Sequence, residues 1–490
     1  MASAEIPSEL KQRFEAAGQD HVFAFWSKLD AEERSKFQAQ LEALDVKRVN
    51  AVYKKALEGE AEAAALAQQR LSLAAPPASS TFSAAGSGSG ASEASKYRKR
   101  GLEAIAARQV GVLLLAGGQG TRLGSSAPKG CYNIGLPSGK SLFQLQAERI
   151  RKLEELAGKE ARIPWFIMTS GPTRQPTIDF FQQNEYFGLK AEDVIFFEQG
   201  TLPCLTMEGK VMLASPSEIA TAPDGNGGIY TALRAPLKGA GGAADGETVI
   251  STLQSRGVKY LHAFGVDNCL VKVGDPTFVG LCIERGVCAG VKTVVKTDPA
   301  ESVGVVAQRN GKWGVIEYSE IPKELSEARD EDGQLSFRAA NIVNHFYTTE
   351  FLAREVPAFE SEMAFHIARK KIPTIDLASG EAVKPSKPNG MKLELFIFDV
   401  FPFIKDLAVH EVARRSEFSP LKNAPNTGVD DPQTSRRDLL AEQRRWLESS
   451  GAKINDAADI EISPLVSYEG EGLESVNGKI LDKSAIIDHI

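Results

Sequence analysis

Three glycines, an arginine and a lysine follow the first strongly apolar segment of the chain, and together they could hold a chain of phosphates. The segment LLLAGGQGTRLG covers residues 113–124, and Pro128-Lys129 comes shortly after it. Arg122 could bind a phosphate through two parallel hydrogen bonds, and Lys129 would add a point charge. Glycines let backbone N–H groups approach an anion without obstruction by a Cβ atom, and here they are Gly117, Gly118 and Gly120. The pattern predicts a phosphate-binding loop rather than a turn with two solvated cations.

Two other glycine patterns do not fit their motifs. A dinucleotide-binding GxGxxG motif would need a glycine at the position of Leu123. The stretch GLPSGKS at 135–141 is similar to a Walker A loop, but Ile134 stands where the first glycine belongs. The sequence therefore disfavours a nicotinamide or flavin cofactor and a P-loop.

Composition excludes several function classes. The 490 residues carry a net charge of −7, with 42% hydrophobic and 25% charged residues, so no nucleic-acid-binding surface is indicated. The five cysteines form no CxxC pair, which favours a reducing compartment. No HExxH motif, apolar signal segment or membrane-length apolar run occurs. We expect a cytoplasmic protein without a membrane or nucleic-acid partner and without zinc chemistry.

The elements that must position the phosphate loop follow an α/β pattern. Short apolar segments at 110–116, 165–170, 194–198 and 260–265 alternate with helical patterns at 142–156, 177–184 and 249–257. This alternation predicts a parallel sheet with crossover helices. Residues 303–318 predict a hairpin that turns at Asn310-Gly311, and FIFDVF at 396–401 predicts a further strand.

The composition also predicts three regions. Residues 1–105 form a helical N-terminal region that includes a flexible Gly/Ser-rich loop at 76–95. Residues 106–405 are expected to form the α/β domain that carries the phosphate loop, and residues 406–490 a small α+β domain with a strand-like piece at 461–466.

Ordered sequence blocks carry a resemblance to a known family. The blocks are LLAGGQGTRLG, PKG, MTSG, FFEQG, PDGNGG, FGVDNCLVKVGDP, VGVV, VIEYSE, NIVNHF, FIFDVFPF and EFSPLKNA. With them the chain resembles the eukaryotic-type UDP-sugar pyrophosphorylase family, and GQGTR resembles its N-acetylglucosamine branch. The resemblance implies a Rossmann-like nucleotidyltransferase core with a mixed, mostly parallel sheet, a helical N-terminal region and a smaller C-terminal domain.

The implied activity is uridylyl transfer. UTP and N-acetyl-α-D-glucosamine 1-phosphate would give UDP-N-acetylglucosamine and pyrophosphate reversibly, with Mg²⁺, or Mn²⁺ as an alternative. The product would serve chitin, glycan and GPI-anchor synthesis, and the enzyme would act as a monomer or homodimer. The resemblance implies catalytic roles for Arg122, Lys129 and Lys422, the last at the sugar phosphate.

The resemblance also implies a UTP site. Gln199 would read uracil, because an amide offers both a donor and an acceptor. Asp267 follows a buried strand, where α/β sheets place ligands, and would help to hold Mg²⁺, unless it serves as a helix cap or a structural hydrogen-bonding group. The implied UTP-binding residues are Leu115, Ala116, Gly117, Gly118, Gln119, Gly120, Thr121, Arg122, Lys129, Gln199, Gly225, Asp267 and Lys392.

A sugar site is implied as well. Glu317 would accept hydrogen bonds from sugar hydroxyls, Asn341 would serve the acetamido group, and two phenylalanines would face the acetyl methyl or belong to the core. The implied residues are Asn226, Gly304, Glu317, Tyr318, Asn341, Phe396, Phe398 and Lys422. His262 and His345 are interpreted as core residues, since a sugar phosphate is already largely dianionic at neutral pH and needs no base.

Three alternatives remain open at this point. The enzyme could prefer another sugar phosphate, such as a galactosamine or glucose phosphate. It could be a sensor that binds nucleotide sugars without turnover. Such a sensor would not need cations that stabilise a transition state. A nicotinamide oxidoreductase fits least because of Leu123.

Overall fold

The computed structural model describes residues 5–68, 73–84, 89–238, 246–318 and 320–489. The chain divides into two compact units, each built from three separate segments. The smaller unit comprises Met1–Leu71, Gln199–Ile229 and Ser361–Asp399. The larger unit comprises Ser72–Glu198, Tyr230–Glu360 and Val400–Ile490. No described helix is long and apolar enough to cross a membrane.

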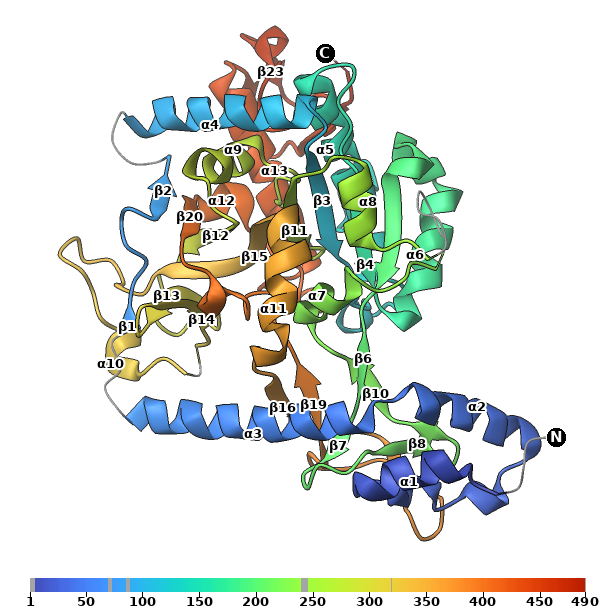
Figure 1. The fold of residues 1–490 in the computed structure, drawn as a ribbon. Coiled ribbons are helices and arrows are strands. Elements are labelled where there is room, and N and C mark those ends of the chain that lie inside the picture. Colours follow the sequence, from blue (N-terminus) through green and yellow to red (C-terminus); the bar gives the residue numbers. More distant parts are fainter. Residues whose placement is uncertain (1–4, 69–72, 85–88, 239–245, 319, 490) are drawn as a thin grey trace. The chain divides into compact units, whose positions relative to one another are not determined.

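An eleven-stranded mixed sheet forms the centre of the larger unit (Figure 1). Its main path is β2 (Thr81–Ser83), β20 (Leu407–Val412), β12 (Ala289–Val295), β15 (Ala339–Thr348), β11 (Tyr260–Gly265), β3 (Val110–Leu115), β4 (Trp165–Thr169) and β5 (Val194–Glu198). Strand β15 runs antiparallel to both neighbours, whereas all other pairs on this path are parallel. The predicted mixed, mostly parallel sheet is confirmed.

Sequence pattern explains these strands. All six residues of β3 are buried, as expected of a parallel strand covered on both faces. β13 (Val305–Arg309) pairs with β14 (Lys312–Ile316), and β1 (Leu73–Ala74) pairs with β13. The predicted hairpin turn is confirmed, because Asn310 and Gly311 both have positive φ, at 52° and 76°.

Helices cover this sheet. The longer ones are α4 (Ser89–Ala106), α5 (Leu142–Ala157), α6 (Gly171–Gln183), α8 (Val249–Ser255), α9 (Pro276–Arg285) and α13 (Pro432–Ser449). Side chains of Ser141, Thr248 and Asp275 accept backbone N–H bonds at the starts of α5, α8 and α9. Short helices are α7 (Ile229–Ala232), α10 (Lys323–Ser326), α11 (Val356–Phe359) and α12 (Arg414–Glu417).

Helices α4 and α9 cross with their backbones in close contact (Figure 1). A Cβ atom on Gly101 would lie 1.9 Å from the Pro276 carbonyl oxygen. A Cβ atom on Gly280 would lie 1.8 Å from the Tyr97 carbonyl oxygen. Glycine at both positions therefore permits the crossing.

The smaller unit has its own core. Helices α1 (Ser8–Ala16), α2 (Ala31–Ala43) and α3 (Val46–Gln68) place Phe14, Phe37 and Val49 in one apolar cluster with Leu205 and Leu393. The strands are β6 (Thr201–Pro203), β7 (Leu205–Thr206), β8 (Leu213–Ser215), β9 (Glu218–Ile219), β10 (Thr221–Pro223), β16 (His366–Lys370), β17 (Thr374–Ile375), β18 (Ala382–Val383) and β19 (Gly390–Glu394). The first residues of the chain are thus part of a core that includes later segments.

The C-terminal part of the larger unit contains α13 and four short strands. β21 (Lys453–Ile454) pairs with β23 (Ile480–Leu481), and β22 (Ile460–Ile462) pairs with β24 (Ala485–Ile487). These elements share an apolar cluster that includes Leu447, Ile462 and Leu473. The domain boundaries predicted at 105 and 405 stay a prediction.

Three local expectations differ from the structure. Residues 396–401 form no strand; they form a turn, because Asp399 accepts a hydrogen bond from the Phe396 N–H (2.6 Å). Within the expected loop at 76–95, β2 buries Phe82 and α4 begins at Ser89, while residues 85–88 lie outside the described residues. The strand at 461–466 is only β22. The Gly/Ala-rich segment KGAGGAADG at 238–246 lies mostly outside the described residues.

Candidate functional site

The glycine-rich segment forms a closed loop at the end of β3. The N–H of Gly120 donates to the Ala127 carbonyl (3.0 Å), and the N–H of Lys129 donates to the Gly118 carbonyl (3.2 Å). The hydroxyl of Ser170, which precedes α6, donates to the Gly117 carbonyl (2.7 Å). These bonds return the chain on itself, so Lys129 lies beside the glycines although it is eleven residues from Gly118 in sequence.

The tip of this loop offers unused donors. Gly118, Gln119, Thr121 and Arg122 are exposed. A Cβ atom on Gly118 would meet nothing within 4 Å, so no protein atom occupies the space beside this residue. Within the described part of the chain, no acceptor engages the backbone N–H groups of Gly118 and Gln119, and no carboxylate pairs with Arg122. A ligand with several anionic oxygens fits such a set of donors.

Lys129 connects this loop to the segment that carries Lys422. Its ammonium group donates to the carbonyl oxygen of Leu421 (3.2 Å), the residue before Lys422. The N–H of Leu421 in turn donates to the carbonyl oxygen of Asp267 (2.8 Å), just past the end of β11. The structure therefore brings together the backbone at Asp267 and Lys422 with the side chain of Lys129.

The Asp267 carboxylate is suited to a metal ion that takes one ligand from the protein, rather than to an ion held by several protein side chains. It is half-buried at the end of β11, and no hydrogen bond or ion pair with another described residue engages it. The described residues contain no group of three or more His, Cys, Asp or Glu side chains that could hold a metal ion. One free carboxylate suits Mg²⁺, which commonly takes its other ligands from phosphates and water.

Three of the predicted sugar residues meet where β13, β14 and β15 adjoin. Gly304 precedes β13 and Glu317 follows β14, and the antiparallel pairing places them together; a Cβ atom on Gly304 would lie 2.9 Å from the Glu317 carboxylate. The Gly304 carbonyl accepts from the N–H of Asn341 on β15 (2.9 Å). Tyr318 is 52% exposed, and its predicted sugar contact stays a prediction.

Backbone strain marks the same place. The Asn341 side-chain oxygen accepts from the N–H of Val343 (3.1 Å), whose φ is 52°. A β-branched residue rarely adopts this left-handed conformation, and strain of this kind gathers at functional sites.

In the smaller unit, Gln199 and Gly225 lie together, as a shared site requires. The Gln199 amide donates to the Gly225 carbonyl (3.3 Å) and also hydrogen-bonds Asp224. Burial raises the pKa of Asp224 to about 7, and the Gln199 amide only partly opposes this rise. One Asp224 oxygen is buried without a partner among the described residues. The sequence analysis did not single out Asp224, although it is the only carboxylate in PDGNGG.

The other predicted residues of this unit surround the same turn. The Asn226 side-chain oxygen accepts from the Ile397 N–H (2.9 Å). The Phe396 ring lies 4.5 Å from the His366 ring and 5.2 Å from the Phe398 ring, so the two phenylalanines are neighbours on a turn rather than on a strand. Lys392 lies on β19 opposite Ala368, and no described residue pairs with its ammonium group.

The two histidines considered as bases are core residues. His262 and His345 are fully buried, and burial lowers the pKa of His262 to about 4 and that of His345 to about 3. The core interpretation is confirmed.

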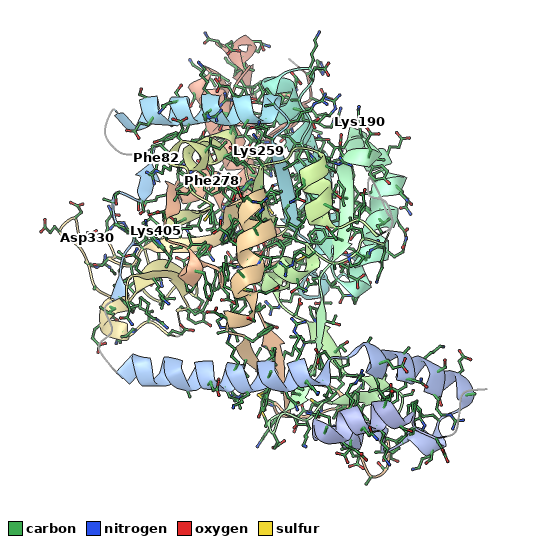
Figure 2. The ribbon with its side chains drawn as sticks, in the orientation of Figure 1. Phe82, Lys190, Lys259, Phe278, Asp330 and Lys405 are labelled. Atoms are coloured by element: carbon green, nitrogen blue, oxygen red, sulfur yellow. The ribbon has the colours of Figure 1, made fainter. Side chains whose placement is uncertain are left out.

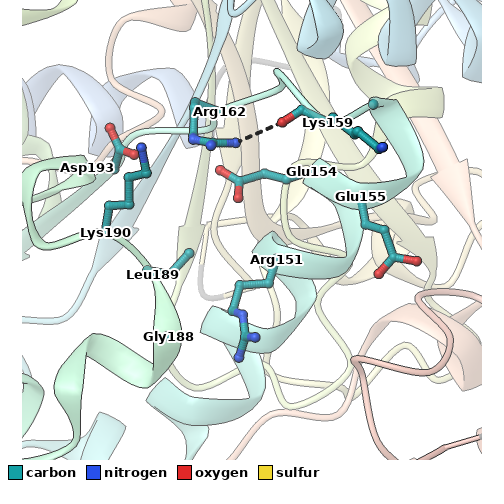
Figure 3. A pocket seen from close by; sticks show the side chains of 10 residues that line it. Arg151, Glu154, Glu155, Lys159, Arg162, Gly188, Leu189, Lys190 and Asp193 are labelled. Atoms are coloured by element: carbon teal, nitrogen blue, oxygen red, sulfur yellow. Dashed lines mark hydrogen bonds between the residues drawn. The ribbon is translucent and has the colours of Figure 1, made fainter.

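A hollow elsewhere on the larger unit contains none of the predicted site residues. It measures about 280 Å³ and is lined mainly by charged side chains of α5, of the following residues 158–162 and of the segment 188–193 (Figure 3). Two of its carboxylates already bind other groups of the protein: Glu154 accepts from the Ile163 N–H (2.8 Å), and Asp193 pairs with Arg256 (3.1 Å). The phosphate loop remains the candidate site.

Comparison with known proteins shows what the chain is similar to. Residues 52–477 match the family model of UTP–glucose-1-phosphate uridylyltransferase. The chain is 43% identical to a UDP-N-acetylglucosamine pyrophosphorylase of Saccharomyces cerevisiae, over 98% of this chain and 99% of that protein. It is 43% identical to UDP-N-acetylhexosamine pyrophosphorylase-like protein 1 of Xenopus tropicalis, over 96% of this chain and 94% of that protein. The crystal structure of a Trypanosoma brucei uridine diphosphate N-acetylglucosamine pyrophosphorylase matches with a TM-score of 0.83 and 32% identity, over 99% of both chains.

Proposed function

Because this chain belongs to the UTP–glucose-1-phosphate uridylyltransferase family, we propose that it transfers the uridylyl group of UTP to N-acetyl-α-D-glucosamine 1-phosphate and releases pyrophosphate. The relatives from yeast and T. brucei that carry the corresponding names support the choice of sugar. The observation that carries the proposal is the set of contacts that places Lys129 against the Lys422 segment and that segment against Asp267.

The residues of the chain act on this reaction mainly through position and charge. The phosphate loop and Arg122 bind the triphosphate of UTP, and Lys129 lies at the α-phosphate. Lys422 holds the sugar phosphate, whose oxygen attacks in line with the departing pyrophosphate. Since the attacking oxygen is already anionic, no general base is needed.

The remaining site residues bind the two ends of the substrates. Gln199 and Gly225 bind uracil, while Gly304, Glu317 and Asn341 bind the amino sugar. Asp267 is the residue that would hold Mg²⁺, with phosphate and water as the other ligands. When bound, the ion supplies neutralisation of the phosphate charge. Manganese would be accepted in its place.

The free cysteines support a cytosolic location for the enzyme. All five are unpaired, as a reducing cytosol requires. We place the enzyme there as a monomer or homodimer.

Pyrophosphate release tests the function. The protein is incubated with UTP, Mg²⁺ and N-acetylglucosamine 1-phosphate, beside glucose 1-phosphate, N-acetylgalactosamine 1-phosphate and a control without sugar. We expect sugar-dependent release that is fastest with N-acetylglucosamine 1-phosphate and is lost with a chelator. Faster release with another sugar phosphate would reassign the substrate, and UDP-sugar binding without release would indicate a sensor.

A further inference from the structure

A lysine is buried in the central sheet close to the candidate phosphate site. Lys292 is the only charged residue of strand β12 and is 0% exposed. Its ammonium group contacts Asp275, the N-cap residue of α9, and lies 2.5 Å from the Glu417 carboxylate. The centroid of the Phe278 ring lies 5.7 Å from the same ammonium group. Phe278 is labelled in Figure 2. A buried charge is expensive, so a lysine here needs a reason beyond the stability of the sheet.

The charges around Lys292 compensate one another. Lys272 lies 3.6 Å from Glu417 and 3.1 Å from Glu469, which also pairs with Arg98 at 2.6 Å. Burial disfavours the charged forms, but Lys292 and Lys272 outweigh it and hold the pKa of Glu417 below its ordinary value. Asp275 and Glu417 likewise raise the pKa of Lys292 despite its burial. The pair at Lys292 and Glu417 is therefore ionised, with strong charge-assisted hydrogen bonds.

Glu417 begins the segment that ends at Lys422. The Glu417 carbonyl accepts from the side-chain amide of Asn268 (2.7 Å). The Asn268 oxygen accepts from the N–H of Ser419 (3.1 Å), and the N–H of Cys269 donates to the Ser419 carbonyl (3.0 Å). Asn268 is 4% exposed, so these bonds are shielded from water. Residues 417–421 are thus joined to residues 267–269 from both sides.

This arrangement fixes the positions of the backbone next to the candidate catalytic groups. Asp267 directly precedes Asn268, Lys422 directly follows Leu421, and Lys129 donates to the Leu421 carbonyl. Lys422 itself is exposed, and no described residue pairs with its ammonium group, so its place depends on the backbone that carries it.

We propose that Lys292, Glu417 and Asn268 are positioning residues for uridylyl transfer at this site. The Lys292–Glu417 pair anchors the start of the 417–422 segment in the sheet, and Asn268 joins that segment to the backbone of Asp267. None of the three touches substrate. The inference rests on the proposed function, because it concerns the same reaction.

Two variants test this role. Asn268→Ala removes the bonds to Glu417 and Ser419 without leaving a buried charge. Glu417→Gln keeps the shape of the side chain but removes its charge, and Lys292 keeps Asp275 as partner. Since a misplacement of about 1 Å can cost about 100-fold in rate, we expect kcat to fall about 10- to 100-fold. The KM for UTP should change less than about threefold, because the phosphate loop is intact.

A matched control separates positioning from stability. Val279 on α9 is fully buried, and Val279→Ala should lower Tm without moving the 417–422 segment. We expect Val279→Ala to keep the wild-type kcat well below its Tm. Hydrogen exchange supplies a second readout: the Ser419 and Leu421 amides should exchange faster in both test variants, while β11 stays protected.

The outcomes are distinct. A fall in kcat for Asn268→Ala and Glu417→Gln, but not for Val279→Ala at equal or greater loss of Tm, supports the inference. If the activity of all three follows Tm alone, or if both test variants keep the wild-type kcat, the three residues do not position the site. Should Glu417→Gln fail to fold, Asn268→Ala decides. Absence of turnover in the wild-type protein would instead reject the proposed function, and the positioning role with it.

Discussion

Arg122, Lys129 and Lys422 each supply a cation at a place where phosphate charge would change. We predict that Arg122→Ala, Lys129→Ala and Lys422→Ala each lower kcat/KM at least ~10²-fold, the usual loss when one charge contact to a transition state is removed. The fold should persist, because Arg122 and Lys422 are exposed. Steady-state kinetics and circular dichroism check this.

A surface lysine outside the site provides the control. Lys190 lies 3.8 Å from Glu192, and both side chains are more than half exposed. Lys190→Ala should leave kcat/KM unchanged. Turnover close to wild type in any one of the three site variants would remove that residue from the mechanism.

The raised pKa of Asp224 predicts that the stability of the protein depends on pH. Its folded pKa of about 7 lies above its ordinary value of 3.8, so the folded protein holds a proton that the unfolded chain releases between these values. The contribution of Asp224 to the free energy of unfolding is therefore greatest at low pH and is lost as pH rises toward 7. The Asp224→Asn variant cannot ionise at this position. Its Tm should therefore rise relative to the wild-type Tm as the pH is raised from 5 to 8.

Thermal unfolding of both proteins across this range measures the effect. A constant difference in Tm from pH 5 to pH 8 would show that Asp224 has an ordinary pKa in the folded protein.

The crossing of α4 and α9 predicts intolerance of any side chain at its contact. Gly101→Ala or Gly280→Ala would place a Cβ atom within 2 Å of a backbone carbonyl, so one helix must move. We expect a loss of about 1–3 kcal/mol in the free energy of unfolding, or more where the backbone cannot shift. Urea unfolding gives the value.

Gly314 on β14 is the matched control. A Cβ atom there would meet nothing within 4 Å. Gly314→Ala should change stability little, and an equal loss of stability at all three glycines would show that the close approach of the two helix backbones is not the cause.

The division into two units predicts how the chain responds to truncation. Phe14, Phe37 and Leu41 share one apolar cluster with Leu205 and Leu393, so the N-terminal helices complete a core rather than form an appendage. Deletion of residues 1–68 would expose this cluster. We expect increased binding of a hydrophobic dye and loss of amide protection in β19, while β3 stays protected.

Hydrogen exchange of the full and truncated proteins tests this expectation. Unchanged protection in β19 would mean that the helices are dispensable for the smaller unit.

The sequence alone determined the features that depend on neighbours along the chain. The glycines and cations after β3, the turn at Asn310-Gly311 and the alternation of strands with helices were predicted because local backbone preference and apolar periodicity are written in consecutive residues. Gly304, Glu317 and Asn341 were named only through family resemblance. Their meeting follows from strand register, which no local pattern fixes.

Only the tertiary structure decided the rest, because it depends on contacts between distant segments. The sequence analysis did not single out Lys292, whose partners Asp275 and Glu417 come from other parts of the chain. FIFDVF has the composition of a strand, yet Asp399 closes it into a turn where pairing of β19 with β16 ends. The smaller unit likewise gathers three separate segments around one core. Burial, charge pairing and close packing depend on contacts between residues that are distant in the sequence, so no local pattern predicts them.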